Sequence, residues 1–197
     1  MNPSAEADLN LFFWEGRTHQ HFTSAPVDEA LLRQLYELAR LGPTGNNSQP
    51  LRLVFVKSPE AKEKLRPALS PTNVDKTMAA PLTIVAAWDT EYYEKFPILT
   101  PHSPESRERI KALPDGMREM LGTQSANLQI GYLILAARGL GLDCGPMGGF
   151  KRDVVDAAFF PDGKWKSLLL VNVGYGDPTK LRPRAPRLDF DEACRIA

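Results

Sequence analysis

A charge-free stretch inside a long predicted helix constrains the fold of this chain more than any other feature. The pattern predicts a helix over 115–140, ended by Gly139 and Gly141, and its second half, 125–137, has no charged residue. A helix that is apolar or small around its whole circumference is buried on every side. A chain of 197 residues has little material to cover such a helix. We therefore expect a partner subunit to cover part of it.

Periodicity and turn residues divide the rest of the chain into short helices and strands. Strands mixed with helices, without regular β-α-β alternation, indicate an α+β fold with one sheet flanked by helices. We expect one domain, 1–197. The predicted elements are a helix from Ser4, as its cap, to Trp14; a helix capped by Asp28 and ended at Gly42-Pro43; a strand over 51–57; a helix from Pro59 that ends before Pro71; a buried central strand over 81–88; an irregular segment over 89–115; a strand over 142–147; a helix over 153–160; a strand over 167–175; and a terminal helix or swapped arm over 189–195.

The composition argues against several classes of function. The 24 basic and 24 acidic side chains give a formal net charge of zero, so there is no basic footprint for nucleic acid. Apolar stretches are too short to span a bilayer, and the N-terminus lacks a signal-peptide pattern. The two cysteines, Cys144 and Cys194, are too few for a disulfide framework. We expect a cytoplasmic protein with a small-molecule substrate and no nucleic-acid or membrane partner.

The common catalytic motifs are missing from the sequence. There is no GxxxxGK[ST] phosphate loop and no GxSxG elbow. Gly139, Gly141 and Gly145 lack the GxGxxG spacing and follow a helix, where the dinucleotide signature follows a strand. The pair His19 and His21 would need a third ligand to hold a metal, and neither cysteine has a histidine nearby in sequence. We expect no metal and no catalytic side chain, so a bound cofactor remains to carry the reaction.

Four polar or glycine-rich segments could hold such a cofactor. Arg17-Thr18-His19 offers a guanidinium fork and a hydroxyl for phosphate oxygens. The loop 44–50 offers amides that suit the edge of a flavin pyrimidine ring. The segment 145–150 allows backbone N–H groups to approach a ligand, and the proline-rich segment 180–187 can hold an arginine toward a phosphate. The candidate residues of the last three segments are Asn46, Asn47, Gln49, Pro146, Met147, Gly148, Gly149, Arg184 and Arg187.

Each segment also has an ordinary interpretation when taken alone. They would then be a solvated polar turn, a plain loop, a strand-to-helix turn and a solvated basic loop. Taken together and in this order, they resemble the nitroreductase family of FMN enzymes from Arg17 to the C-terminus. Within it, the chain is most similar to the subgroup that contains a malonic semialdehyde reductase of pyrimidine degradation. The motifs that carry the resemblance are Arg17-Thr18-His19, Gly42-Pro43-Thr44, the run 64–70, Gly141-Leu142-Asp143, Gly145-Pro146-Met147, the run 172–177 and Pro186-Arg187-Leu188.

The resemblance implies an α+β fold with a central mixed sheet, assembled as an intertwined homodimer with FMN at the subunit interface. It implies that Arg17 and Thr18 hold the phosphate and ribityl side, and that Arg187, helped by Arg184, binds the phosphate. Many relatives carry a second basic residue where Gln20 stands, so phosphate charge compensation here rests on fewer cations or on His19.

The resemblance also assigns roles around the flavin ring. Asn47 and Gln49 match the family's N-x-Q-P loop at the pyrimidine edge, although Leu51 stands where many relatives have tryptophan. Met147 and Gly148 would supply backbone N–H groups beside the isoalloxazine.

The activity that the resemblance implies is a ping-pong oxidoreduction. NADH or NADPH passes a hydride to flavin N5, and a second substrate then receives it. The subgroup points to malonic semialdehyde, reduced to 3-hydroxypropanoate, with Arg107, Arg109 or Lys111 as candidate partners of its carboxylate. The alternatives are a nitroreductase or quinone reductase of broad specificity, a non-catalytic flavin-binding protein and a flavin-independent interaction module.

Overall fold

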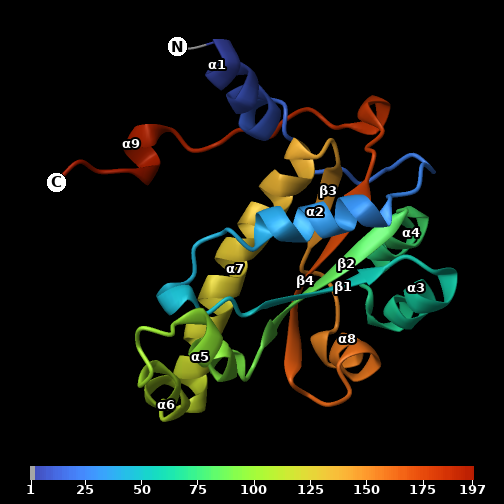
Figure 1. The fold of residues 1–197 in the computed structure, drawn as a ribbon. Helices are drawn as coiled ribbons and strands as arrows, with labels where there is room; N and C mark the ends of the chain where they lie inside the picture. The colour runs from blue at the N-terminus through green and yellow to red at the C-terminus, as the bar shows by residue number, and fades with distance from the viewer. Residues whose placement is uncertain (1–2) are drawn as a thin grey trace.

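A four-stranded antiparallel sheet forms the centre of the computed structural model, which describes residues 3–197 (Figure 1). The prediction of a mixed sheet is wrong for these strands, because each neighbouring pair is antiparallel. The connections between neighbouring strands contain helices, so their length permits either direction. A parallel pairing occurs at the isolated bridge between Thr18 and Cys144. In spatial order the strands are β1 (Leu51–Val56), β2 (Leu82–Asp89), β4 (Trp165–Gly174) and β3 (Asp143–Met147).

The central strand β2 is buried along its whole length, as predicted. Successive side chains of a strand point to opposite faces. Ile84 therefore packs with the helices of one face, while Val85 packs with those of the other. The result is three layers, with helices covering both faces of the sheet.

Helices α2 (Glu29–Ala39) and α7 (Asp115–Gly139) cover the first face (Figure 1). The predicted cap is confirmed, because the Asp28 side chain accepts a hydrogen bond from the Ala30 N–H at 2.9 Å. The long predicted helix is confirmed as α7. Gly141 follows it with a φ of 75°, a conformation that glycine adopts without strain.

The charge-free half of α7 is only partly covered within one chain. Ile130 and Leu133 are buried against the sheet, as expected. Leu128 and Tyr132 instead leave 49% and 44% of their surface exposed, which corrects the prediction of burial on every side for the single chain. They lie one turn apart and form one open apolar face. Other large apolar side chains left exposed on α2 and α7 are Tyr36, Leu38, Met117 and Met120.

Helices α3 (Pro59–Leu65), α4 (Pro71–Ala79) and α8 (Arg152–Phe159) lie on the opposite side of the sheet (Figure 1). Helices α3 and α8 confirm predictions, although α3 passes into a 3₁₀ turn, η3 (Arg66–Ala68). Helix α4 was not predicted, because its sequence has few apolar residues at helical spacing. The buried Lys62 ammonium donates to the Thr77 carbonyl at 2.9 Å and to that of Ala80, and so caps the C-terminal end of α4.

The segment 89–115, predicted to be irregular, contains three short helices. They are η4 (Tyr92–Lys95), α5 (Phe96–Leu99) and α6 (Ser106–Lys111). Tyr92, Phe96 and Ile110 are buried in one cluster with residues of α7 and of the sheet. These helices are each too short to show periodicity in the sequence, and burial of Tyr92, Phe96 and Ile110 holds them in place.

The two ends of the chain leave the body on the same side (Figure 1). Helix α1 (Pro3–Leu9) continues as a π-helical turn, η1 (Asn10–Trp14), so the predicted helix is confirmed, with Ser4 inside it. After η5 (Pro178–Lys180) the C-terminal arm is extended as far as α9 (Phe190–Ala193), a short helix capped by Asp189. Within residues 3–197, no helix is both long and apolar enough to cross a membrane.

Candidate functional site

The first predicted segment lies along the outer edge of β3. Its backbone docks there through the bridge of Thr18 to Cys144, and the His19 N–H donates to the Cys144 carbonyl at 3.0 Å. Gly145 makes this close approach possible, since a Cβ on it would lie 2.3 Å from the His19 carbonyl oxygen. Arg17 and Thr18 are thereby fixed relative to the sheet.

The C-terminal arm returns to the same place. The Arg184 guanidinium donates to the carbonyls of Trp14 at 2.8 Å and of Gly16 at 2.9 Å. Arg17 in turn donates to the carbonyl of Arg182. Arginine-to-carbonyl hydrogen bonds therefore join two segments that are far apart in sequence. Neither guanidinium has a carboxylate partner among residues 3–197.

A cavity of about 280 Å³, which we call the arginine cavity, opens between these segments. In the part of the chain that the structure describes, none of its four guanidinium groups has a carboxylate within ion-pair distance. A planar guanidinium group can bind two phosphate oxygens at once through two parallel N–H donors. The cavity is thus suited to a dianion. Its lining residues are Phe13, Gly16, Arg17, Thr18, Arg138, Arg184, Ala185 and Arg187.

His19 is not part of this lining. Its side chain is buried, with Nε2 3.3 Å from Asp143 Oδ1, and its Nδ1 has no hydrogen-bond partner among the described residues. A Cβ on Gly176 would overlap the imidazole. The structure therefore places His19 between the docked segment and the sheet, facing away from the arginine cavity.

The glycine-rich segment follows β3 at its far end. Met147 is the last residue of the strand and is buried, while Gly148 and Gly149 are exposed. The N–H groups of both glycines find no acceptor within residues 3–197. The Gly149 carbonyl accepts from the Asn73 amide at 2.8 Å, and a Cβ on Gly149 would lie 2.8 Å from that nitrogen. Asn73 thus holds the turn in place, and the two glycine N–H groups remain available to a ligand. Pro146 precedes the turn within the strand.

The loop 44–50 carries the strongest backbone signal of a built site. Asn46, Asn47 and Gln49 have φ values of 52°, 50° and 41°, in the left-handed region that side chains disfavour. The Gln49 amide donates to Asn47 Oδ1 at 3.0 Å, and Asn47 donates to the Leu99 carbonyl at 2.9 Å. Amides that bond one another in this way form a pre-arranged set of donors and acceptors.

This loop does not meet the other predicted segments in one chain. It leads into β1, whereas the glycine-rich turn and the arginine cavity lie at β3, on the other edge of the sheet. Three strand spacings, about 14 Å, separate the two edges. The four predicted segments therefore form two groups, with the loop 44–50 at the β1 edge and the other three segments at the β3 edge.

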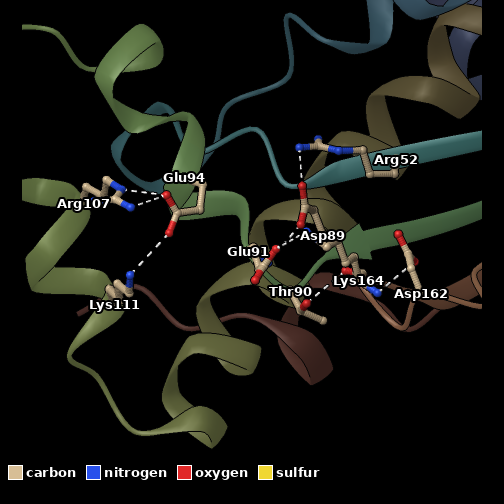
Figure 2. A network of polar contacts seen from close by, with 9 residues as sticks. All are labelled: Arg52, Asp89, Thr90, Glu91, Glu94, Arg107, Lys111, Asp162 and Lys164. Atoms are coloured by element: carbon tan, nitrogen blue, oxygen red, sulfur yellow. Dashed lines mark hydrogen bonds and ion pairs between the residues drawn. The ribbon is translucent and has the colours of Figure 1, made fainter.

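Another cavity lies on the β1 side, beside Gln49. It has a volume of about 780 Å³ and is bordered by charges that neutralise one another. Arg52 pairs with Asp89 at 2.7 Å, and Glu94 pairs both with Arg107, at 2.5 Å, and with Lys111, at 3.7 Å. Figure 2 shows these pairs. The hydrogen bond from Arg107 holds the pKa of Glu94 below its usual value.

Two of the three candidate partners for a substrate carboxylate are therefore already engaged. Arg107 and Lys111 share Glu94, and Arg107 also pairs with Glu108. Arg109 donates to the Ser106 hydroxyl at 3.3 Å. The sequence offered no way to see these pairings, because they join helices that were not predicted.

The remaining reactive side chains do not form a second centre. Burial raises the pKa of Cys144 to about 12, which keeps its thiol protonated and unreactive. The described part of the chain contains no group of three histidine, cysteine or acidic side chains that could hold a metal ion.

Arg138 and Gly16 line the arginine cavity but were not found from the sequence. An arginine in the last turn of a helix is ordinarily explained by the helix dipole, and Gly16 resembles any turn glycine. Only the return of the C-terminal arm reveals that both face the predicted phosphate-binding residues.

Comparison with known proteins gives a consistent picture. The model of the nitroreductase family matches residues 16–175. A Stutzerimonas stutzeri protein, provisionally named NADH dehydrogenase/NAD(P)H nitroreductase, is 53% identical over 189 residues, covering 96% of this chain and 95% of that protein. A Bacillus subtilis structure provisionally described as a nitroreductase has a TM-score of 0.89 at 20% identity, covering 98% of this chain and 100% of that one. Another, from Exiguobacterium sibiricum and solved with FMN, has a TM-score of 0.84 at 19% identity and covers 96% of each chain.

Proposed function

The chain belongs to the nitroreductase family, and we propose that it is an FMN-dependent oxidoreductase that uses NADH or NADPH. The observation that carries the proposal is the arginine cavity, which gathers four guanidinium groups without a carboxylate partner among the described residues around a space suited to a phosphate dianion. The relative solved with FMN and the relative named for NAD(P)H support this choice of cofactor and reductant.

The residues on the β3 edge fit one FMN molecule in an extended arrangement. Arg17, Thr18, Arg184 and Arg187 would hold the phosphate in the arginine cavity. From the bridge at Cys144 to the free N–H groups at the glycine-rich turn, the strand spans about 13 Å. An extended ribityl chain along this edge would bring the flavin ring to those donors.

A second copy of the chain would complete the site. The loop with Asn46, Asn47 and Gln49 lies at the other edge of its own sheet, so it reaches this flavin only from a partner. The uncovered apolar face of α7, with Leu128 and Tyr132, is the surface that a partner would bury. We therefore propose a homodimer with two shared sites, working in the cytoplasm.

Bound FMN would supply the redox chemistry by accepting a hydride at N5 and returning it to a second substrate. The protein would contribute binding and position. The free donors of Gly148 and Gly149 would hydrogen-bond the ring beside N5. The amides of Asn47 and Gln49 would fix the pyrimidine edge, and the guanidinium groups would anchor the phosphate so that one face of the ring remains open to substrates.

We propose malonic semialdehyde as the oxidising substrate, on the strength of the subgroup motifs. Because Glu94 and Glu108 together balance the charges of Arg107 and Lys111, Arg109 remains the least engaged of the earlier candidates for the substrate carboxylate. The names of the relatives favour a second candidate function, the reduction of nitro compounds.

The test follows the visible spectrum of FMN-loaded protein under anaerobic conditions. NADH should bleach the flavin band, and malonic semialdehyde should restore it. Restoration by nitroaromatics or quinones alone would keep the enzyme class and remove the semialdehyde. Bound flavin that NADH does not bleach would indicate a flavin-binding protein without catalysis, and absence of a flavin band would overturn the proposal. Light scattering on the same sample should give the mass of a dimer, and a monomer that keeps full activity would exclude the shared site.

A further inference from the structure

Arg138 lies in the last turn of α7, on the wall of the arginine cavity. Its guanidinium is partly buried, and Nη1 donates to the Phe12 carbonyl at 2.6 Å. No carboxylate within residues 3–197 pairs with it. A guanidinium has five N–H donors, so this bond leaves most of them for the cavity.

Gly16 provides the space that this guanidinium occupies. A Cβ on Gly16 would lie 2.7 Å from Arg138 Cζ and 2.7 Å from Nη1, closer than van der Waals contact allows. Gly16 does not have a positive φ, so its backbone conformation does not require glycine. The absence of a side chain at Gly16 therefore allows the Arg138 guanidinium to approach the turn that holds Arg17.

The helix dipole alone does not account for this arrangement. Carbonyl groups at the C-terminal end of α7 stabilise a nearby cation, and that would suffice for an arginine facing solvent. Arg138 instead faces a cavity that already contains Arg17, Arg184 and Arg187. Four like charges around one space repel one another unless an anion enters it.

We infer that Arg138 is a further phosphate-binding residue, and that Gly16 is the positioning residue that admits its guanidinium. The inference rests on the proposed FMN site and adds two residues to it. It also supplies a cation in place of the one that is lost at Gln20.

The experiment compares two flavins that differ only in the phosphate. Full-length protein freed of flavin is titrated with FMN and with riboflavin. The dissociation constant for riboflavin divided by that for FMN measures the contribution of the phosphate. Arg138→Gln should lower this ratio at least about tenfold, the worth of a charge-assisted hydrogen bond, and Arg138→Lys should lower it less. Arg66→Gln is the matched control, since Arg66 pairs with Glu63 on the surface of another helix, and it should leave the ratio unchanged.

Gly16→Ala separates phosphate binding from a structural role of Arg138. In the natural background it should lower the ratio, because the new methyl group displaces the guanidinium. In the Arg138→Gln background it should have no further effect, because the group it displaces is gone. Equal weakening of FMN and riboflavin by Arg138→Gln, or additive effects of the two substitutions, would overturn the inference. A natural protein that binds neither flavin would instead overturn the proposed function.

Discussion

The two edges of the central sheet both carry clusters of arginine and lysine, but their charges are balanced in different ways. At the β1 edge, Arg52, Arg107 and Lys111 each lie against an aspartate or glutamate (Figure 2). At the β3 edge, Arg17, Arg138, Arg184 and Arg187 have only backbone carbonyls as partners among the described residues.

The difference indicates which cluster could accept an anionic ligand. Cations paired within the chain are neutral as a group and contribute to the structure whether or not a ligand is bound. Cations held by carbonyls keep their full charge, so an anion could bind them without displacing a carboxylate of the chain. Counting basic residues in the sequence would have ranked the two edges alike.

The largest effect is expected from replacing arginines with glutamine at the β3 edge. Arg17→Gln combined with Arg187→Gln should raise the dissociation constant for FMN by about a hundredfold or more, because two charge-assisted contacts are lost. Arg107→Gln, at the β1 edge, should change it by less than about twofold, since Glu94 already neutralises that charge. Fluorescence titration of flavin-free protein measures both. A comparable loss from Arg107→Gln would abolish the distinction between the edges.

A smaller effect is expected where the first segment docks on β3. Gly145→Ala would place a methyl carbon 2.3 Å from the His19 carbonyl oxygen, so the segment with Arg17 has to move. Overpacking of this kind costs about 1–3 kcal/mol, which urea unfolding can measure. Gly116→Ala, on α7 with no atom within 4 Å, is the control and should leave stability unchanged or raise it by up to about 1 kcal/mol. Equal stability of the two variants would show that the docking is loose.

The smallest effect is expected at Glu94 and depends on pH. The hydrogen bond from Arg107 lowers the pKa of Glu94 below the ordinary value of 4.5. The folded protein therefore binds that proton less readily than the unfolded chain, and the resulting stability is present above about pH 4.5 and lost below it. Melting temperatures from pH 3 to 7 should show a shallower decline on the acid side for Glu94→Gln. A decline identical to that of the natural protein would show that solvent screens the pair completely.

The sequence was most informative about long elements and least informative about the site. α7 and β2 could be predicted because burial imposes a pattern over many residues. α4 and the short helices after β2 could not, because tertiary contacts such as the cap by Lys62 and the burial of Phe96 stabilise them. The resemblance indicated which segments to expect at the site, yet it could not show that Asn47 lies at the opposite edge from Arg17. The extent of the single domain and the roles of the individual site residues remain predictions.

The order of the strands has a consequence for synthesis on the ribosome. β2 is buried by a neighbour on each side, and one of them, β4, is translated roughly 80 residues later. At roughly 5–20 residues per second, the apolar run of β2 leaves the ribosome several seconds before that neighbour exists. During this interval β1 is its one available partner, and a two-stranded ribbon is only marginally stable. The nascent chain thus passes through a state in which an aggregation-prone strand is exposed.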